Sequence, residues 1–211
     1  MGPHDPETEA LIRDAVRGDE RARHQLLDRH RGQLRRMVAL RLDRRLAPRL
    51  DPSDIVQEAL ADAAGKLDDY LRDPPLPFYP WLHRLAAERL VQAHRRHLKA
   101  QARTVGREHP GGLPLPDESA LQLAERLVAS GTSPSRRLLR DELRQQVRAA
   151  LMRLAPNDRE VLVMCYLEGL AFAAIAAILG ITENAAKVRH FRALERIRKL
   201  MEHDDGGELG R

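Results

Sequence analysis

The side chains best suited to chemistry in this chain are cationic, and they gather toward its C-terminal end. Residues 154–199 read LAPNDREVLVMCYLEGLAFAAIAAILGITENAAKVRHFRALERIRK, in which Gly180 separates two stretches of helical pattern. The second stretch carries amide and basic side chains: Asn184, Lys187, Arg189, Arg192, Arg196 and Arg198. Such groups donate hydrogen bonds to base edges and phosphates. The pattern therefore predicts a helix-turn-helix unit that reads the DNA major groove.

The second helix of this unit is expected to have one apolar stripe and one exposed basic face. At about 100° per residue, the stripe contains Ala186, Ala193, Leu194, Ile197 and Met201. The candidate contacts to DNA lie near the start of the helix and largely away from that stripe: Thr182, Asn184, Lys187, Val188, Arg189 and Arg192. Arg196, Arg198 and Lys199 come later and are expected to meet phosphates or solvent. His190 is expected to be a hydrogen-bonded core histidine.

Side-chain sets that would support catalysis or metal binding are not evident in the sequence. Nothing resembles a nucleophile beside its base, or a glycine-rich loop that holds a phosphate. His83, His94 and His97 could suggest a metal site, and His94 and His97 share a helical face, but no cysteine or carboxylate completes a zinc site. The single Cys165 stands in the apolar run VLVMCYL and is expected to be a buried thiol. We therefore expect a non-enzyme without cofactor or metal.

Charge is distributed in blocks along the 211-residue chain, whose formal net charge is +5. Seven Arg or Lys residues and one acid fall between His83 and Arg107, whereas seven acids and two bases fall between Asp51 and Asp73. These blocks predict one surface for nucleic acid and another for a basic protein. We find no signal peptide and no apolar run long enough to cross a bilayer. We therefore expect a cytoplasmic protein without membrane insertion.

The elements that must position these side chains are all predicted to be helices, because no alternating strand pattern occurs. Helices are expected from about Glu7, over 21–42, over 51–70 with Asp51 as N-cap, over 81–101 and within 134–201, with an irregular loop at 73–80. The Gly/Pro-rich stretch 104–136 predicts a flexible linker, in which 121–128 could form a short helix and 117–128 an amphipathic docking helix. The expected fold is all-α, with two small helical domains at 1–103 and 137–204 and a frayed tail at 205–211.

Several segments together resemble bacterial RNA polymerase sigma factors of the sigma-70 family, extracytoplasmic-function (ECF) type. DIVQE (54–58) resembles the signature DLVQE, and LIRDAVRGDERARHQLLDRH (11–30) is similar to the family's first helices. FYPWLHRLAAERLVQAHRR (78–96) resembles the family's aromatic pair, Trp-Leu and basic helix, while 154–198 resembles its C-terminal domain. The resemblance covers roughly residues 7–101 and 137–201 in the family's order.

The resemblance implies a transcription initiation factor with two helical domains, called sigma-2 and sigma-4. Sigma-2 is implied to dock on the clamp helices of core RNA polymerase and to recognise and open the −10 element of the promoter. Sigma-4, a helix-turn-helix domain, is implied to read the −35 element and to contact the polymerase flap. The implied partners are core RNA polymerase and promoter DNA, double-stranded and melted. An anti-sigma protein is a further candidate partner.

Polymerase docking is implied for the acidic helix at 51–70. Asp54, Gln57 and Glu58 match the family's docking positions, and Ile55 belongs to the same segment. An acidic, hydrogen-bonding face suits docking on a basic coiled coil. Without the resemblance, the same face is more simply an ordinary solvated face.

The −10 contacts are implied to come from an aromatic segment and the helix that follows it. Phe78, Tyr79 and Trp81 flank the loop where the family captures an extruded base, and aromatic rings stack on such bases. Core packing is the alternative for these rings and is favoured for Trp81. The candidates on the helix are Arg84, Glu88, Arg89, Gln92, Arg95 and Arg96, whose arginines would neutralise phosphates. Glu88 and Gln92 stand where many members carry Asn and Asp, so the −10 sequence cannot be transferred from relatives.

Two other functions fit part of the sequence. A helix-turn-helix transcriptional regulator of the two-component response type would share the C-terminal unit. Such a regulator needs a strand–helix receiver domain upstream, where this chain shows only helical pattern. A sigma-mimicking adaptor protein would bind a regulator in place of DNA, but basic side chains occupy both predicted DNA-reading helices.

Overall fold

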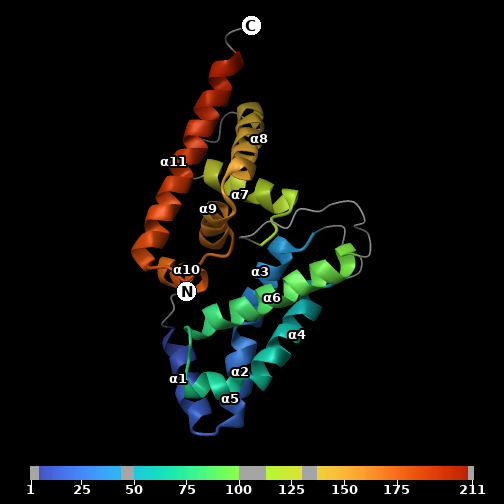
Figure 1. Cartoon of the computed structure of the whole chain (residues 1–211), viewed down its shortest axis with the longest axis vertical. Helices are drawn as coiled ribbons and strands as arrows, with labels where there is room; N and C mark the ends of the chain where they lie inside the picture. The colour runs from blue at the N-terminus through green and yellow to red at the C-terminus, as the bar shows by residue number, and fades with distance from the viewer. Residues whose placement is uncertain (1–4, 44–49, 100–112, 130–136, 209–211) are drawn as a thin grey trace.

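The computed structural model describes residues 5–43, 50–99, 113–129 and 137–208, and all regular structure within these ranges is helical (Figure 1). The N-terminal unit comprises α1 (Pro6–Val16), α2 (Glu20–Arg29), α3 (Arg31–Arg41), α4 (Pro52–Gly65), α5 (Leu67–Arg72) and α6 (Phe78–Lys99). The C-terminal unit comprises α7 (Asp117–Ala129), α8 (Arg137–Arg153), α9 (Pro156–Leu162), the π-helical turn η1 (Val163–Leu167), α10 (Phe172–Leu179) and α11 (Glu183–Glu208). The prediction of an all-α protein is confirmed.

The helix predicted over residues 21–42 is divided into α2 and α3 at His30. The imidazole of His30 is buried, with its Nε2 atom 3.2 Å from the Thr8 hydroxyl and its ring 5.6 Å from those of Phe78 and Tyr79. These tertiary contacts fix His30 at φ −96° and ψ −3°, which departs from regular helix geometry. The prediction of one helix was wrong because helical periodicity does not reveal a break made by long-range packing.

The helix predicted over residues 51–70 begins as expected and ends early. The Asp51 carboxylate accepts a hydrogen bond from the Ser53 backbone N–H at 2.7 Å, and Pro52 occupies the first turn. This arrangement satisfies one backbone donor that the first turn leaves free. The helix stops at Gly65, and Lys66 at φ −107° separates it from α5.

The proline-rich loop is shorter than predicted, because α6 already begins at Phe78. Pro80 therefore lies inside a helix. Proline is tolerated there because the first turn of a helix leaves its own N–H groups without intrahelical acceptors. The expectation that residues 78–80 are irregular was wrong for this reason, and it changes how Phe78 and Tyr79 are oriented.

A 13-residue helix, α7, occupies part of the predicted linker. Leu123, Ala124 and Val128 of α7 are buried in the same core cluster as Val147 and Leu151 of α8. Residues 100–112 and 130–136 of the linker region lie outside the described residues. The segment 117–129 is therefore an integral layer of the C-terminal unit.

The predicted helix-turn-helix is present as α10, a short turn and α11. Gly180 ends α10 with φ +66°, a left-handed conformation that a side chain would strain. The Thr182 hydroxyl accepts a hydrogen bond from the Ala185 backbone N–H at 3.1 Å and so caps the next helix. Helix α11 continues to Glu208, so residues 205–208 of the tail expected to fray are helical, and residues 209–211 lie outside the described residues.

The two units pack against each other. Figure 1 shows α6 lying below the α9–α10 region, and α6 and α10 are in contact. One core cluster joins both units, since Met164, Leu170 and Ile175 pack with side chains such as Leu82 and Leu90. The second cluster belongs mainly to α7, α8, η1 and α11. The described part of the chain thus adopts a closed arrangement.

Candidate polymerase and nucleic-acid interfaces

The start of α11 presents the side chains predicted to contact DNA. Thr182, Asn184, Lys187, Val188 and Arg192 are exposed, whereas Ala186, Ala193 and Ile197 are buried and Leu194 and Met201 are half-buried. The predicted division into an apolar stripe and an outward basic face is therefore correct. The Nζ atom of Lys187 lies 2.7 Å from a carboxylate oxygen of Glu183, one turn earlier in the helix. This ion pair is exposed and therefore contributes little to stability.

Arg189 and His190 are less exposed than the rest of this face. Arg189 is half-buried, with its Nε atom 3.9 Å from an Asp158 carboxylate oxygen. His190 lies 3.3 Å from the Tyr166 hydroxyl, and the two rings stack with centroids 5.6 Å apart. His190 was predicted to be a hydrogen-bonded core histidine: it has the polar partner, but it is half-buried and not in the core. Burial lowers the pKa of His190.

Phe191 is an exposed aromatic residue that the sequence analysis did not single out. Its side chain is 61% exposed on α11, between the exposed Val188 and Arg192 positions. An apolar side chain on a solvent-facing helix position is the signal that could have identified it.

Helix α4 has the predicted division between an apolar face and an acidic face. Asp54, Gln57 and Glu58 are exposed, opposite the buried Val56 and Ala59. Ile55 was included among the docking residues, but it is only 3% exposed and packs in the core. The structure corrects that assignment, because a side chain this buried supports the helix and does not reach a partner.

The aromatic segment at the start of α6 is buried. Phe78 is 2% exposed, and Tyr79 and Trp81 are also buried. Trp81 stacks on Tyr70 with centroids 4.4 Å apart, and Phe78 meets Tyr70 edge to face. Burial raises the pKa of the Tyr79 hydroxyl.

In this conformation the three rings are not accessible for stacking on an unpaired base, and the prediction that they stack is corrected. The physical reason is the early start of α6, which turns Phe78 and Tyr79 into the N-terminal core and away from a loop surface. Core packing, the alternative favoured for Trp81, accounts for all three.

The basic face predicted on α6 is exposed in part. Arg84, Arg95 and Arg96 are exposed, as phosphate contacts require. Arg89 instead forms an ion pair with Asp62 of α4, and its Nη1 atom lies 3.9 Å from Glu58. The hydrogen bond to Asp62 is the main cause that raises the pKa of Arg89. Arg89 is thus paired with α4 in this structure. The expectation that its side chain is free to contact a DNA phosphate is corrected.

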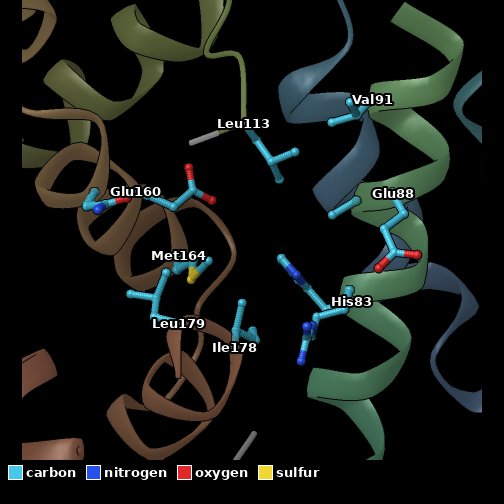
Figure 2. Close-up of a pocket in the computed structure, with 11 residues that line it drawn as sticks. His83, Glu88, Val91, Leu113, Glu160, Met164, Ile178 and Leu179 are labelled. Carbon is cyan, nitrogen blue, oxygen red and sulfur yellow. The ribbon is translucent and has the colours of Figure 1, made fainter. Parts of the chain in front are cut away.

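Glu88 and Gln92 remain exposed on α6, and Glu88 borders a cavity of about 350 Å³ between the two units. Figure 2 shows Glu88 and His83 on α6 facing Met164, Ile178 and Leu179 of the C-terminal unit. Arg84 lines the same space. Two residues predicted to contact the −10 element thus lie beside the helix-turn-helix unit.

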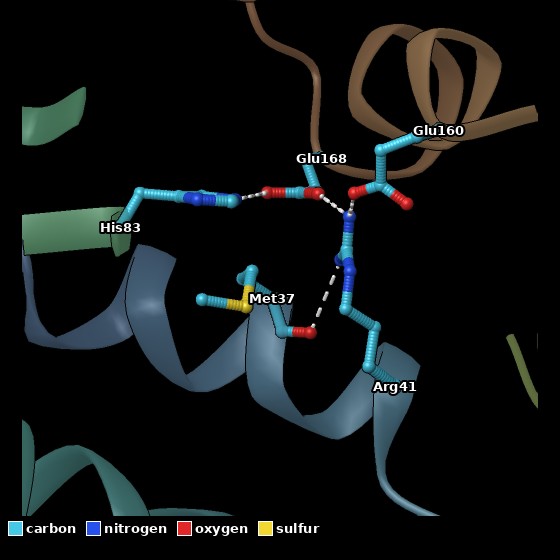
Figure 3. Close-up of polar contacts among 5 residues, drawn as sticks. All are labelled: Met37, Arg41, His83, Glu160 and Glu168. Carbon is cyan, nitrogen blue, oxygen red and sulfur yellow. Dashed lines mark hydrogen bonds and ion pairs between the residues drawn. The ribbon is translucent and has the colours of Figure 1, made fainter. Parts of the chain in front are cut away.

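Four buried charged or polar side chains join the two units, and they form a cluster defined here as Arg41, His83, Glu160 and Glu168 (Figure 3). The Arg41 Nη2 atom lies 2.5 Å from an oxygen of Glu160 and 2.5 Å from an oxygen of Glu168. The His83 Nε2 atom lies 3.2 Å from the other Glu168 oxygen. Sequence reasoning missed this cluster because its members are spread from position 41 to position 168.

The electrostatics of the cluster favour its charged form. Burial alone would raise the pKa of Glu168, but the charges and hydrogen bonds of Arg41 and His83 lower it to about 2. Burial likewise opposes the charge of Arg41, and the two carboxylates raise its pKa nonetheless. Both partners therefore remain ionised at neutral pH.

The described residues include no group of three or more His, Cys, Asp or Glu side chains placed to hold a metal ion. His83 is part of the ionic cluster, His94 is buried, and the side chain of His97 lies outside the described residues. Cys165 is half-buried, and burial raises the pKa of its thiol. Among the described helices, none is long and apolar enough to cross a membrane.

A basic helix-turn-helix unit joined to a second helical unit defines a protein of the helix-turn-helix DNA-binding class. Residues 144–197 match the family described as Sigma-70, region 4. The chain is 30% identical over 194 residues to the ECF RNA polymerase sigma-E factor of Escherichia coli (strain K12), covering 90% of this chain and 91% of that protein. The chain therefore belongs to the ECF sigma factors of the sigma-70 family.

Two further comparisons agree with this assignment. The RNA polymerase sigma-H factor of Pseudomonas aeruginosa is 26% identical over 192 residues, covering 91% of this chain and 92% of that protein. A solved structure described as CnrH in complex with the cytosolic domain of CnrY is 25% identical, with a TM-score of 0.52, covering 94% of this chain and 99% of that chain. As an ECF sigma factor, the protein directs RNA polymerase to promoters and is not an enzyme.

Proposed function

We propose that the three predicted contact regions divide the work of promoter recognition. The acidic face of α4 (Asp54, Gln57 and Glu58) docks on the clamp helices of core RNA polymerase. The exposed face of α6 contacts the −10 element, and the start of α11 reads the −35 element. The observation that carries this proposal is the outward position of all three sets, each opposite a buried apolar face of its own helix.

The −35 contacts are Thr182, Asn184, Lys187, Val188, Arg189 and Arg192. Lys and Arg pair with guanine, Asn pairs with adenine, and an apolar side chain such as Val188 suits a thymine methyl group. Arg189 would have to leave Asp158 to reach DNA, since its guanidinium is half-buried beside that carboxylate. We therefore assign Arg189 a lesser role than Lys187 and Arg192.

The −10 contacts are the exposed Arg84, Glu88, Gln92, Arg95 and Arg96 of α6. The arginines would neutralise phosphates, which gives a steep dependence of DNA affinity on salt concentration. Glu88 can accept a hydrogen bond from a cytosine amino group, so we expect a −10 element that contains cytosine at the position it meets.

The C-terminal unit is proposed to begin at α7, whose apolar face belongs to its core. We further propose that the C-terminal unit contacts the polymerase flap, that the protein acts in the cytoplasm with the polymerase, and that a regulatory protein partner restrains it. The regulatory partner is supported by the similar protein CnrH, whose solved structure is a complex with the cytosolic domain of CnrY.

Glu58→Arg tests the docking assignment. Reversing an exposed charge on the α4 face should abolish binding to core polymerase, because a cation would face the basic coiled coil. The fold should persist, since Glu58 is exposed and its ion pair to Arg89 is long, at 3.9 Å. The measurement is a pull-down with purified core enzyme, with circular dichroism to check helix content.

Asp69→Arg is the matched control, because Asp69 is an exposed acid of the same unit that lies on α5. It makes the same change in charge outside the proposed docking face. Unchanged core binding by Glu58→Arg, or equal loss in both variants, would contradict the docking assignment.

A further inference from the structure

The ionic cluster connects elements that the rest of the fold keeps in different units. Arg41 ends α3 and His83 lies on α6, both in the N-terminal unit, whereas Glu160 lies on α9 and Glu168 follows η1 in the C-terminal unit. The four side chains are at most 9% exposed. Figure 3 shows them in a row, His83 to Glu168 to Arg41 to Glu160.

Each acid of the cluster depends on a cation from the other unit. Both carboxylates meet the same nitrogen of Arg41, whose Nη1 atom also donates to the Met37 carbonyl at 3.3 Å. A buried charge without its partner is strongly unfavourable, whereas the same charge in water is not. The cluster is therefore stable with the units fully together or fully apart, and unstable between those states.

The backbone around Glu168 is shaped to place its side chain at this junction. The Glu168 N–H donates to the Val163 carbonyl at 3.1 Å, which closes the wide turn of η1. Gly169 follows with φ +71°, a conformation that favours glycine. Single π-helical turns are frequently found at functional sites. Here the turn positions Glu168 between Arg41 and His83.

The closed arrangement conflicts with simultaneous reading of two promoter elements. Helix α10 contacts α6, and α11 follows α10 after a turn of three residues, so the two proposed DNA-reading helices lie close together (Figure 1). Elements centred about 25 base pairs apart are separated by roughly 85 Å at about 3.4 Å per base pair. Arg84 and Glu88 also border the space between the units (Figure 2).

We propose that the cluster of Arg41, His83, Glu160 and Glu168 is an interdomain latch that holds the free protein closed, and that the latch must separate before the two promoter elements are engaged together. This inference rests on the proposed roles of α6 and α11. A partner that binds only the open state, such as core polymerase on promoter DNA, shifts the population toward it. The latch therefore lowers the apparent affinity of the free protein for that partner.

The latch can be tested by a distance measurement on the full-length protein. Spin labels at Ala64→Cys on α4 and Glu195→Cys on α11, both exposed positions, report the separation of the units in a Cys165→Ser background. The latch variants are Arg41→Leu, which leaves two buried acids without their cation, and Glu168→Gln, which keeps the shape of the side chain. The control is Arg36→Leu, at an exposed arginine of the same helix α3.

The labelled protein with an intact latch and the Arg36→Leu variant should each give one narrow distribution of distances between the two labels. Arg41→Leu should give a broader distribution shifted to longer distances. Circular dichroism verifies that helix content is retained. If Arg41→Leu does not fold, Glu168→Gln carries the test with the same expectation. Wild-type distances in a folded latch variant would overturn the proposal.

A second arm measures binding to core polymerase on promoter DNA. An opened latch variant should bind with an apparent affinity on the order of tenfold higher than Arg36→Leu, because more of the free protein is competent. Unchanged or lower affinity in an opened variant would overturn the inhibitory role. If distances respond to Arg41→Leu but the wild-type protein supports no initiation, the proposed promoter roles fail, and with them the regulatory role of the latch; only its closing of the two units stands. If the wild-type protein initiates but distances do not respond, only the latch is removed.

Discussion

Basic side chains along α11 differ in their distance from its N-terminal end, and this difference should separate base reading from phosphate contact. Lys187 is exposed in the second turn of the helix, whereas Arg196 is exposed more than two turns later. A helix that enters the major groove by its N-terminal end brings only the early residues to base edges. Sequence discrimination should therefore depend on Lys187 and hardly on Arg196.

Lys187→Ala should weaken binding to the −35 duplex by about 1–3 kcal/mol and reduce discrimination against a scrambled duplex. Fluorescence anisotropy of the full-length protein with both duplexes measures the two affinities. Arg196→Ala is the control, and it should weaken both duplexes to a similar extent. Equal weakening of both duplexes by Lys187→Ala would show that Lys187 contacts phosphate and not a base.

Single residues were predictable where their own helix decides their exposure. The outward Glu58 and Lys187 and the capping Asp51 follow from helical spacing and side-chain chemistry. The burial of Phe78 and Tyr79 was not predictable in the same way. It depends on where α6 begins and on the rings that pack there, such as that of Tyr70.

At the scale of elements, α7 is the part of the fold that composition described least well. The Gly/Pro-rich stretches around it predicted a flexible linker, yet α7 buries an apolar face against α8. Two polar contacts fix its position, from Arg126 to the Tyr166 carbonyl at 2.7 Å and from Arg148 to Asp117 at 2.7 Å. The amphipathic pattern of α7 predicts that the helix packs against another surface, but the pattern does not indicate which surface.

Leu123→Ala should lower the free energy of unfolding by about 2–5 kcal/mol, because Leu123 is fully buried between α7 and its neighbours. Urea denaturation followed by circular dichroism gives the value. Gln122→Ala, at an exposed position of the same helix, should change stability by less than about 0.5 kcal/mol. A negligible effect of Leu123→Ala would mean that α7 is a tether without a structural role.

Element boundaries show which signals are local. The cap at Asp51 and the turn at Gly180 were predicted because each depends on residues next to it in sequence. The break at His30 and the π-helical turn η1 instead accompany contacts with distant residues: His30 meets Thr8, and Glu168, which follows η1, meets Arg41.

At the scale of the whole molecule, the described structure is one closed body with a buried ionic junction. Glu168 has a pKa lowered to about 2, well below its ordinary value of 4.5. A lowered pKa in the folded state contributes stability above the ordinary pKa, and that contribution is lost as the pH falls toward the folded value. The relevant window is therefore pH 4.5 to about 2.

The stability of wild-type protein relative to Glu168→Gln should fall by on the order of 3 kcal/mol between pH 6 and pH 2, the equivalent of a pKa lowered to about 2. This difference should shrink as the pH falls below 4.5, because protonated Glu168 no longer attracts Arg41. Urea denaturation of both proteins at a series of pH values measures the difference and cancels the titration of other groups. A difference that does not vary with pH would contradict the assignment.

The central claim is that this chain directs core RNA polymerase to promoters through two separated DNA-reading helices. The most direct measurement mixes the purified protein with bacterial core RNA polymerase and a genomic promoter library, and then sequences the transcripts. We expect discrete start sites that require the protein, share two upstream sequence elements and disappear with Glu58→Arg. Binding of the protein to DNA without core enzyme, with no start site that depends on it, would contradict a role as a sigma factor.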